Sequence, residues 1–338
     1  MKLSFNRDGK TYIIRPASST DVIQVTELIN ICSQELYGRD EMNPDELEND
    51  WRLEGFDLEK DSLLILQEST LVGYADIWRV VPPFVRYDTL IQVHPDFRGM
   101  GFGWLLNVWA ESRAQELMQK AQEGLRVFLS SYVNARDQEA VKLLNEFGSK
   151  IERYSLIMER DLSGIIEGPS LPDGFSIRMA RQDEYPDIYK LQRECFRDHW
   201  GFIEVPLEKG YQLFQANYIN DPFFQPELWF VIEHDGDIVG LIIGTSVTSY
   251  GEDYGWIGSL GVLREYRKLG LGKALLLQAF NVLQLLGSTK VGLSVDAQSL
   301  TGATKLYQNV GMTIVEKFIR FEKTLREGLD LRTTRIGE

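Results

Sequence analysis

The sequence predicts an α/β protein with two tandem domains, each built on a mixed sheet flanked by helices. Three observations support this prediction. The chain has 338 residues, enough for about two domains of ordinary size. One pattern of strand, glycine-rich turn and helix occurs twice, 169 positions apart, at 93–106 and 262–275. In both halves, short apolar runs alternate with segments that have helical periodicity, which is typical of an α/β fold.

The second copy shows its elements most clearly. Apolar runs and the turn signal Asp235-Gly236 predict strands, and apolar residues at helical spacing predict helices. In chain order we expect a strand at 175–179, a helix at 187–197, strands at 228–233, 238–243 and 256–262, a helix from 272 to about 286, a strand at 291–295, a helix at 301–309 and a strand at 312–321. The first copy follows the same order.

The repeat extends beyond the glycine-rich turns. With small drifts in offset, Leu28, Cys32 and Gly38 match Leu191, Cys195 and Gly201, and Ala140 and Gly148 match Ala303 and Gly311. A repeat of this length indicates duplicated domains rather than a solenoid. The segment 162–174 is rich in glycine and proline, so we place the boundary there. The predicted domains are residues 1–163 and 174–338.

Composition excludes several classes of protein. The net charge is −14, which argues against a nucleic-acid-binding surface. No apolar run is long enough for a spanning helix, and the first residues contain no apolar core of a secretory signal. Two cysteines and three histidines offer neither a disulfide framework nor a metal site. We therefore expect a cytoplasmic protein with no metal and no membrane partner.

The two glycine loops are candidates for phosphate binding. They read Arg98-x-x-Gly101-x-Gly103 and Arg267-x-x-Gly270-x-Gly272, each between a strand and a helix. Backbone N–H groups in such a loop and the following helix N-terminus attract anions. Arg264, Lys268 and Lys273 add positive charge. The alternative is a helix start that uses glycine only to turn. Neither loop has the Rossmann or the Walker pattern.

The second glycine loop resembles the acetyl-CoA-binding motif of the GNAT superfamily of N-acetyltransferases. The segment 295–312, with Leu306-Tyr307 and Gly311-Met312, resembles the second motif of that superfamily. The resemblance covers nearly the whole chain as two tandem GNAT-like domains, similar to mycothiol synthase. It implies a mixed, mostly antiparallel sheet flanked by helices in each domain, with acetyl-CoA (coenzyme A) as the cofactor.

The resemblance also implies a role for each site residue. An N–H at Leu260 would polarise the thioester, and Tyr307 would protonate the departing thiolate; the alternative for Tyr307 is a core aromatic. The amine would attack the thioester directly. The implied cofactor-binding residues are Leu260, Gly261, Val262, Arg267, Lys268, Leu269, Gly270, Leu271, Gly272, Lys273 and Ser299 in the second copy, and Ile91, Val93, Arg98, Gly99, Met100, Gly101, Phe102 and Gly103 in the first.

The sequence departs from the family pattern at three places. Leu144 replaces Tyr307 in the first copy, so the first domain is expected to bind coenzyme A without efficient turnover, or to serve structure. Ser299 stands where the family usually has asparagine. Trp256 stands where mycothiol synthase-like enzymes have a glutamate base, which argues against a true mycothiol synthase. The nearby Glu252 and Asp253 either act through a water or form an exposed acidic turn.

Two further segments each allow two interpretations. The segment Asp198-His199-Trp200-Gly201 either lines an acceptor site or packs a helix end. Residues 40–61 carry ten acidic side chains, which either steer a cationic amine to the protein or form a solvated surface.

We therefore expect an N-acetyltransferase that acetylates the primary amine of a small molecule, with its chemistry in the C-terminal domain. The alternatives are a protein or peptide Nα-acetyltransferase and a non-catalytic acyl-CoA sensor. We expect a monomer or a weak homodimer, since two domains in tandem can replace a dimer.

Overall fold

The computed structural model describes residues 3–78, 81–299 and 302–334. It divides the chain into two compact units. Unit 1 contains the described residues of 1–153 and 318–331, and unit 2 contains those of 154–317 and 332–338. No helix within the described residues is long and apolar enough to cross a membrane.

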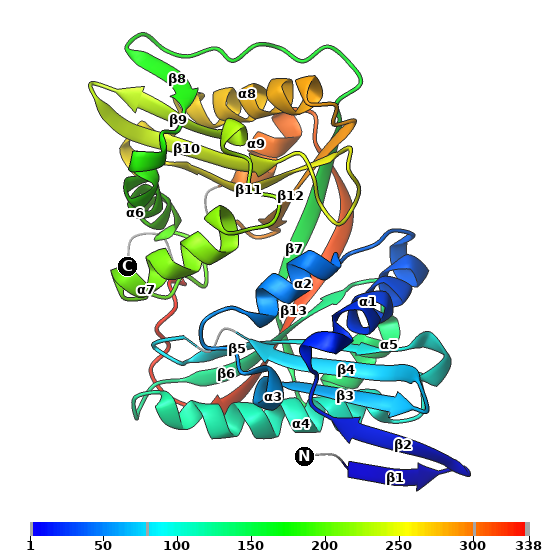
Figure 1. Ribbon diagram of the computed structural model, residues 1–338. Helices are drawn as coiled ribbons and strands as arrows, with labels where there is room; N and C mark the ends of the chain where they lie inside the picture. The colour runs from blue at the N-terminus through cyan, green and yellow to red at the C-terminus, as the bar shows by residue number, and fades with distance from the viewer. Residues whose placement is uncertain (1–2, 79–80, 300–301, 335–338) are drawn as a thin grey trace. The chain divides into compact units, whose positions relative to one another are not determined.

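Unit 1 is one mixed sheet with helices on both faces (Figure 1). The strand order is β1-β2-β3-β4-β5-β6-β13, and only β5 and β6 run parallel. Helices α1 and α2 pack against one face, and α4 packs against the other. The elements are β1 (Leu3–Arg7), β2 (Lys10–Arg15), α1 (Val22–Tyr37), α2 (Pro44–Trp51), α3 (Leu58–Asp61), β3 (Ser62–Gln67), β4 (Thr70–Trp78), β5 (Arg86–Val93), α4 (Phe102–Leu117), β6 (Val127–Asn134) and α5 (Gln138–Glu146).

Unit 2 repeats this architecture. The strand order is β7-β12-β11-β10-β9-β8, and only β11 and β12 run parallel. Helices α6 and α7 cover one face, and α8 and α9 cover the other. The elements are β7 (Lys150–Asp161), β8 (Phe175–Met179), α6 (Tyr185–Phe196), α7 (Leu207–Phe214), β9 (Trp229–His234), β10 (Asp237–Thr245), β11 (Tyr254–Val262), α8 (Leu271–Leu285), β12 (Lys290–Asp296), α9 (Ala303–Asn309) and β13 (Thr313–Arg326).

The two units exchange their last strands. Residues 155–161 of β7 pair with β12 in unit 2, although β7 begins in unit 1. Residues 318–326 of β13 return to pair with β6 in unit 1. The chain crosses between the compact units inside β7 and again inside β13, whereas the domain boundary predicted from the sequence lies between 163 and 174.

The glycine- and proline-rich segment 162–174 is an irregular connection within unit 2, where its first part lies along α8. The amide of Gln284 donates to the Gly164 carbonyl at 2.9 Å, and Asn281 donates to the Glu167 carbonyl at 3.0 Å. Its composition fits a segment without regular structure, which does not have to separate two domains.

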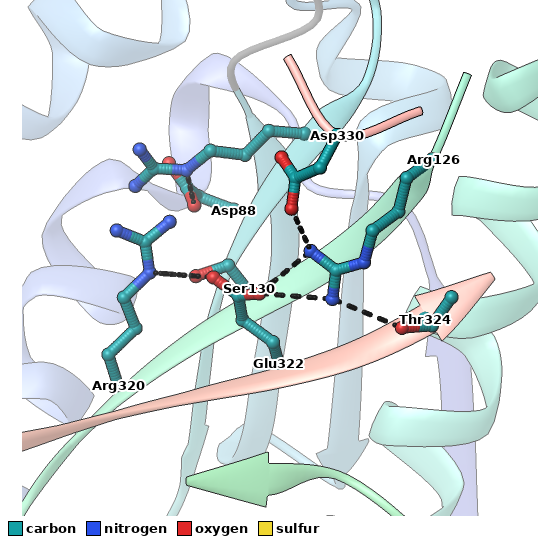
Figure 2. Close-up of polar contacts among 8 residues, drawn as sticks. Asp88, Arg126, Ser130, Arg320, Glu322, Thr324 and Asp330 are labelled. Atoms are coloured by element: carbon teal, nitrogen blue, oxygen red, sulfur yellow. Dashed lines mark hydrogen bonds and ion pairs between the residues drawn. The ribbon is translucent and has the colours of Figure 1, made fainter. Parts of the chain in front are cut away.

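Buried charges fix the returning strand in unit 1 (Figure 2). Arg126, which directly precedes β6, donates to Glu322 at 3.3 Å and to Asp330 at 3.2 Å. Arg320 donates to Ser130 at 3.2 Å and lies 3.3 Å from Glu322. Both Arg320 and Glu322 are buried. A one-residue slip would separate these partners and leave buried charges without them, so the network specifies the register of β13 against β6.

The expected elements of the second copy occur with shifted ends. The helix expected at 187–197 is α6 at 185–196, and the closing strand continues to Arg326. The helix expected at 301–309 begins at Ala303, and Thr301 lies outside the described residues. Helix α7 was not predicted.

The acidic segment 40–61 makes several local contacts. Asp61 is buried and accepts from Arg113 at 2.8 Å. Glu48 pairs with Arg52, and Asp57 with Lys60. These contacts belong to the packing and surface of unit 1; a steering role for the segment stays a prediction.

Candidate functional site

The two glycine loops have the same backbone conformation. After Arg267, the residues Lys268 and Gly270 have φ of 68° and 84°, and α8 begins at Leu271. After Arg98, the residues Gly99 and Gly101 have φ of 74° and 78°, and α4 begins at Phe102. Neither helix has a side-chain cap. Alternating left-handed residues turn successive N–H groups to one side, which forms an anion-binding concavity at each helix start.

The last glycine of each loop serves a different purpose. A Cβ on Gly272 would lie 3.1 Å from Leu306 Cδ2, and one on Gly103 would lie 2.9 Å from Leu143 Cδ1. These glycines therefore allow α8 to approach α9 and α4 to approach α5. The motif spacing thus reflects helix packing as well as ligand binding.

The Arg267 side chain is occupied by the protein. Its three nitrogens donate to the Val262 carbonyl at 3.1 Å, to Asp198 at 2.9 Å and to the Cys195 carbonyl at 3.1 Å. In unit 1, Arg98 pairs with Glu35. Each arginine therefore holds its glycine loop to the first helix of its unit, and the loop offers a ligand its backbone N–H groups and the nearby lysines.

The sheet of unit 2 opens beside this loop. The parallel strands β11 and β12 pair only as far as Ile257 and Leu293, while β11 continues to Val262 against β10. The N–H of Leu263 donates to the Val239 carbonyl at 3.0 Å. Because N–H directions alternate along a strand, those of Leu260 and Val262 point away from β10 and into the opening.

Unit 1 opens in the same way. Strands β5 and β6 pair as far as Thr89 and Ser131. The N–H of His94 donates to the Val72 carbonyl at 2.9 Å, so the N–H groups of Ile91 and Val93 point into that opening.

A bulge distinguishes the two units. In unit 2, Ile243 faces Ser259 and Gly244 faces Ile257, so Gly258 of β11 has no opposite residue on β10. In unit 1, the pairing of β4 with β5 shows no register shift. A β-bulge bends its strand and often lies next to a functional site. In the sequence, this bulge is indicated only by a glycine inside an apolar strand.

Tyr307 and Leu144 occupy matching places on α9 and α5. Both are buried, and Tyr307 packs into the core between the sheet and α8. Burial raises the pKa of the Tyr307 hydroxyl to about 12. The hydroxyl therefore stays protonated at neutral pH, as a proton donor must. Its counterpart Leu144 lines the cleft of unit 1.

The predicted residues of the first copy gather around one cleft. It has a volume of about 520 Å³ and is bounded by the end of β5, the glycine loop and α5. Its lining includes Ile91, Val93, Arg98, Gly99, Gly101, Phe102 and Gly103. Met100 is the one predicted residue of this copy outside that lining.

The glycine loop of unit 2 borders a cavity of about 410 Å³. Leu269, Gly270 and Lys273 face it, together with residues 167–168 and 170–172. Leu271 is buried in the core, so only its backbone is available to a ligand. Gly261 packs against Cys195, since a Cβ there would lie 2.8 Å from the cysteine Cβ.

Ser299 lies in the loop between β12 and α9. Its N–H donates to the Asp296 carbonyl at 3.0 Å, and its carbonyl accepts from Gly302 at 3.3 Å. The motif residues Leu300 and Thr301 lie outside the described residues.

The two acidic candidates for a general base differ in their surroundings. Asp253 accepts from the Thr289 hydroxyl at 2.6 Å, and its carbonyl accepts from the Thr289 N–H at 2.8 Å. It therefore stabilises the turn before β12. Glu252 is exposed in the turn that precedes β11. Trp256 packs over Gly292, where a Cβ would lie 2.9 Å from the indole ring.

Residues 198–201 form the packed end of α6. Asp198 binds Arg267, and the centroids of the His199 and Phe196 rings lie 4.4 Å apart with the ring planes tilted by 49°. Burial and the neighbouring Arg267 lower the pKa of His199. These contacts give the segment a structural role, which corresponds to the second of its two readings.

The cysteines of the two copies are unreactive. Burial raises the pKa of Cys195 to about 12 and that of Cys32 to about 11. A thiol with so high a pKa is a poor nucleophile at neutral pH. This fits chemistry without a covalent intermediate on cysteine.

The geometry defines a class of protein. Each unit is an α/β domain whose sheet opens between two parallel strands, with a glycine loop in left-handed conformation at the start of the next helix. The chain matches the acetyltransferase (GNAT) family model over residues 24–148 and 185–312. It therefore belongs to the GNAT family, and it is an acetyltransferase with two tandem domains of that fold. The predicted fold class, family and enzyme class are confirmed.

Known proteins resemble nearly the whole chain. It is 28% identical to the mycothiol acetyltransferase of Thermobispora bispora over 261 residues, which cover 74% of this chain and 79% of that protein. A crystal structure of a GCN5-related N-acetyltransferase from Sphaerobacter thermophilus has 29% identity and a TM-score of 0.80, covering 95% of this chain and 98% of that one. A tandem GNAT protein from the clavulanic acid biosynthesis pathway has 15% identity and a TM-score of 0.69, covering 94% and 100%. This last likeness concerns the fold alone.

Proposed function

We propose that unit 2 transfers the acetyl group of acetyl-CoA to the primary amine of a small molecule. The observation that carries this proposal is the difference between the units. Both have the glycine loop and the sheet opening, but only unit 2 adds the Gly258 bulge and the buried hydroxyl of Tyr307.

The residues of unit 2 fit the pyrophosphate and the pantetheine arm of coenzyme A. The N–H groups of the loop from Arg267 to Gly272 bind the two phosphates, and Lys268 and Lys273 supply positive charge. The N–H groups of Leu260 and Val262, together with the Leu260 carbonyl, pair with the extended arm as an added strand would. The Val262 carbonyl is already bound to Arg267.

Two groups assist the transfer itself. Acetyl-CoA supplies an activated thioester, and the neutral amine attacks its carbonyl carbon. The Leu260 N–H stabilises negative charge on the carbonyl oxygen. As the carbon–sulfur bond breaks, Tyr307 donates its proton to the sulfur. The amine loses a proton to water, and water returns one proton to the Tyr307 phenolate, which restores the enzyme.

Unit 1 binds coenzyme A without efficient turnover in this proposal, or has a structural role. Its cleft keeps the anion-binding loop, but Leu144 has no proton to give. The relative from Thermobispora bispora is named for a small molecule, mycothiol, which favours a small acceptor over a protein.

One experiment separates the three candidate functions. The full chain is mixed with acetyl-CoA and a panel of small amines or of peptide N-termini, and free thiol is measured. The proposal expects release with small amines. Release with peptides alone indicates an Nα-acetyltransferase. No release, with two coenzyme A molecules bound per chain, indicates a sensor and refutes the proposal.

A further inference from the structure

Unit 2 has a second pocket, on the sheet face opposite α8. It has a volume of about 280 Å³ and is formed by α6, the loop after it, α7 and the bulge residue Gly258. Its walls are mostly aromatic and aliphatic, from Tyr189, Phe196, Phe202, Ile203, Val205 and Tyr218. The volume is slightly below that of typical ligand sites, about 300–1,000 Å³, so the pocket suits one residue-sized group of a larger molecule.

The pocket lies against the strand that carries the proposed chemistry. The Tyr218 hydroxyl is 3.4 Å from the Gly258 carbonyl, and Gln192 of α6 donates to the Ser259 hydroxyl at 2.9 Å. Leu260 is two residues further along β11, which corresponds to about 7 Å of extended strand. A molecule whose amine reaches Leu260 therefore extends into this pocket with its other end.

One cation lines this apolar pocket. Arg193 has a side chain that is 14% exposed. Its Nη2 binds Glu204, while Nη1 is buried and makes no hydrogen bond of good geometry within the described part of the chain. A guanidinium presents two parallel donors to a carboxylate. Here Arg193 also interacts with Tyr189, but its Nη1 still lacks a hydrogen bond of good geometry among the described residues, which is costly for a buried charged donor.

Glu204 is a replaceable partner. Its side chain is 54% exposed and lies in the loop between α6 and α7. It is also 3.7 Å from Arg197, which pairs with Glu194 at 3.0 Å. These four side chains carry no net charge together. A ligand carboxylate in the place of Glu204 would engage both donors of Arg193, and the displaced Glu204 would keep Arg197 as its partner.

We propose that this pocket binds the acceptor through a carboxylate, with Arg193 as its ligand and Glu204 as the group that it displaces. The substrate class is an amine with an apolar body and a carboxylate at its far end. This inference rests on the proposed function for the position of the amine. Arg193 is then a specificity-determining residue of the acceptor site.

The test compares matched acids and amides. Phenylalanine, glycylphenylalanine and diglycylphenylalanine, each as free acid and as C-terminal amide, are titrated calorimetrically into the full chain. A charge-assisted hydrogen bond contributes a factor of about ten to a hundred in affinity. We expect the acid of at least one length to bind at least tenfold tighter than its amide.

Variants assign this preference to the pocket. Arg193→Gln removes the preference for the free acid over the amide, and Arg193→Lys keeps part of that preference. Glu204→Gln strengthens it, because the competing carboxylate is gone; this exposed substitution does not endanger the fold. Lys190→Gln, an exposed cation of α6 that pairs with Asp187 and lies outside the pocket lining, is the matched control and changes the acid preference less than threefold. Circular dichroism of each variant checks the fold.

Two results overturn the inference: equal affinity of acids and amides at all three lengths, or an acid preference that survives in Arg193→Gln. Thiol release from acetyl-CoA is measured separately with the same six molecules. If the acids bind as expected but no amine is acetylated, the proposed chemistry fails and the assignment of the pocket stands.

Discussion

Replacing Tyr307 with phenylalanine tests the proposed proton donor with little disturbance of the fold. The ring packs in the core of unit 2 beside α8, and no hydrogen bond of its hydroxyl is present in the described part of the chain. The substitution therefore removes one oxygen and no structural contact. We expect the free energy of unfolding to change by less than about 1 kcal/mol.

The catalytic effect is expected to be much larger. A positioned general acid contributes about 10²–10⁴-fold to a rate, so kcat falls by that factor while coenzyme A affinity is unchanged. Burial raises the pKa of Tyr307 to about 12. At pH 8 only about one molecule in 10⁴ is ionised. The wild-type rate is therefore not limited by this ionisation at any pH below about 11.

The assay measures thiol release at saturating acetyl-CoA, together with calorimetric binding of coenzyme A. Tyr185→Phe, a buried tyrosine on α6 at the other face of the sheet, is the matched control and keeps full activity. A Tyr307→Phe enzyme with more than half of the wild-type kcat refutes the assignment of the proton donor.

Three further predictions concern the fold. Gly261→Ala places a Cβ 2.8 Å from the Cys195 Cβ and lowers the free energy of unfolding in urea by about 1–3 kcal/mol, whereas Gly168→Ala, where the space is open, has little effect. Arg126→Met removes a partner of the buried Glu322 and lowers the free energy of unfolding in urea by about 3 kcal/mol, whereas Arg52→Met, which removes an exposed pair with Glu48, costs less than about 1 kcal/mol; equal losses in the two variants contradict the role of the network. Burial raises the pKa of Asp76 to about 7, so the native state holds this proton where the unfolded state has lost it, and Asp76 lowers stability progressively from about pH 4 to pH 7. Between pH 5 and pH 8, the free energy of unfolding therefore falls less in Asp76→Asn than in the wild type. An equal fall in both proteins contradicts this prediction.

The sequence was informative where one residue type has one physical use. Paired glycine loops between a strand and a helix predicted two anion-binding turns, and both have that conformation. The match of Cys32 with Cys195 predicted equivalent positions, and both are buried on the first helix of their unit. The alternation of short apolar runs with helical segments also predicted a mixed sheet in each unit, and both units have one.

The exchange of β7 and β13 was not predictable from one sequence. Apolar alternation shows that a segment is a strand, but it does not identify the neighbouring strand. The buried charges Arg320 and Glu322, which fix the exchanged strand, are indistinguishable in sequence from surface charges. The same holds at the site: nothing local showed that Arg267 would bind Asp198 or that Arg193 would line a pocket.

The central claim is that unit 2 performs the chemistry, and a pair of matched variants tests it most directly. Gly270 and Gly101 both have positive φ, and neither has a backbone atom near an added Cβ. Aspartate tolerates this conformation and places a negative charge in the phosphate-binding loop. With acetyl-CoA and an accepted amine, we predict that Gly270→Asp lowers kcat/KM at least a hundredfold and that Gly101→Asp changes it less than threefold. Loss of turnover in Gly101→Asp with activity retained in Gly270→Asp would contradict the claim.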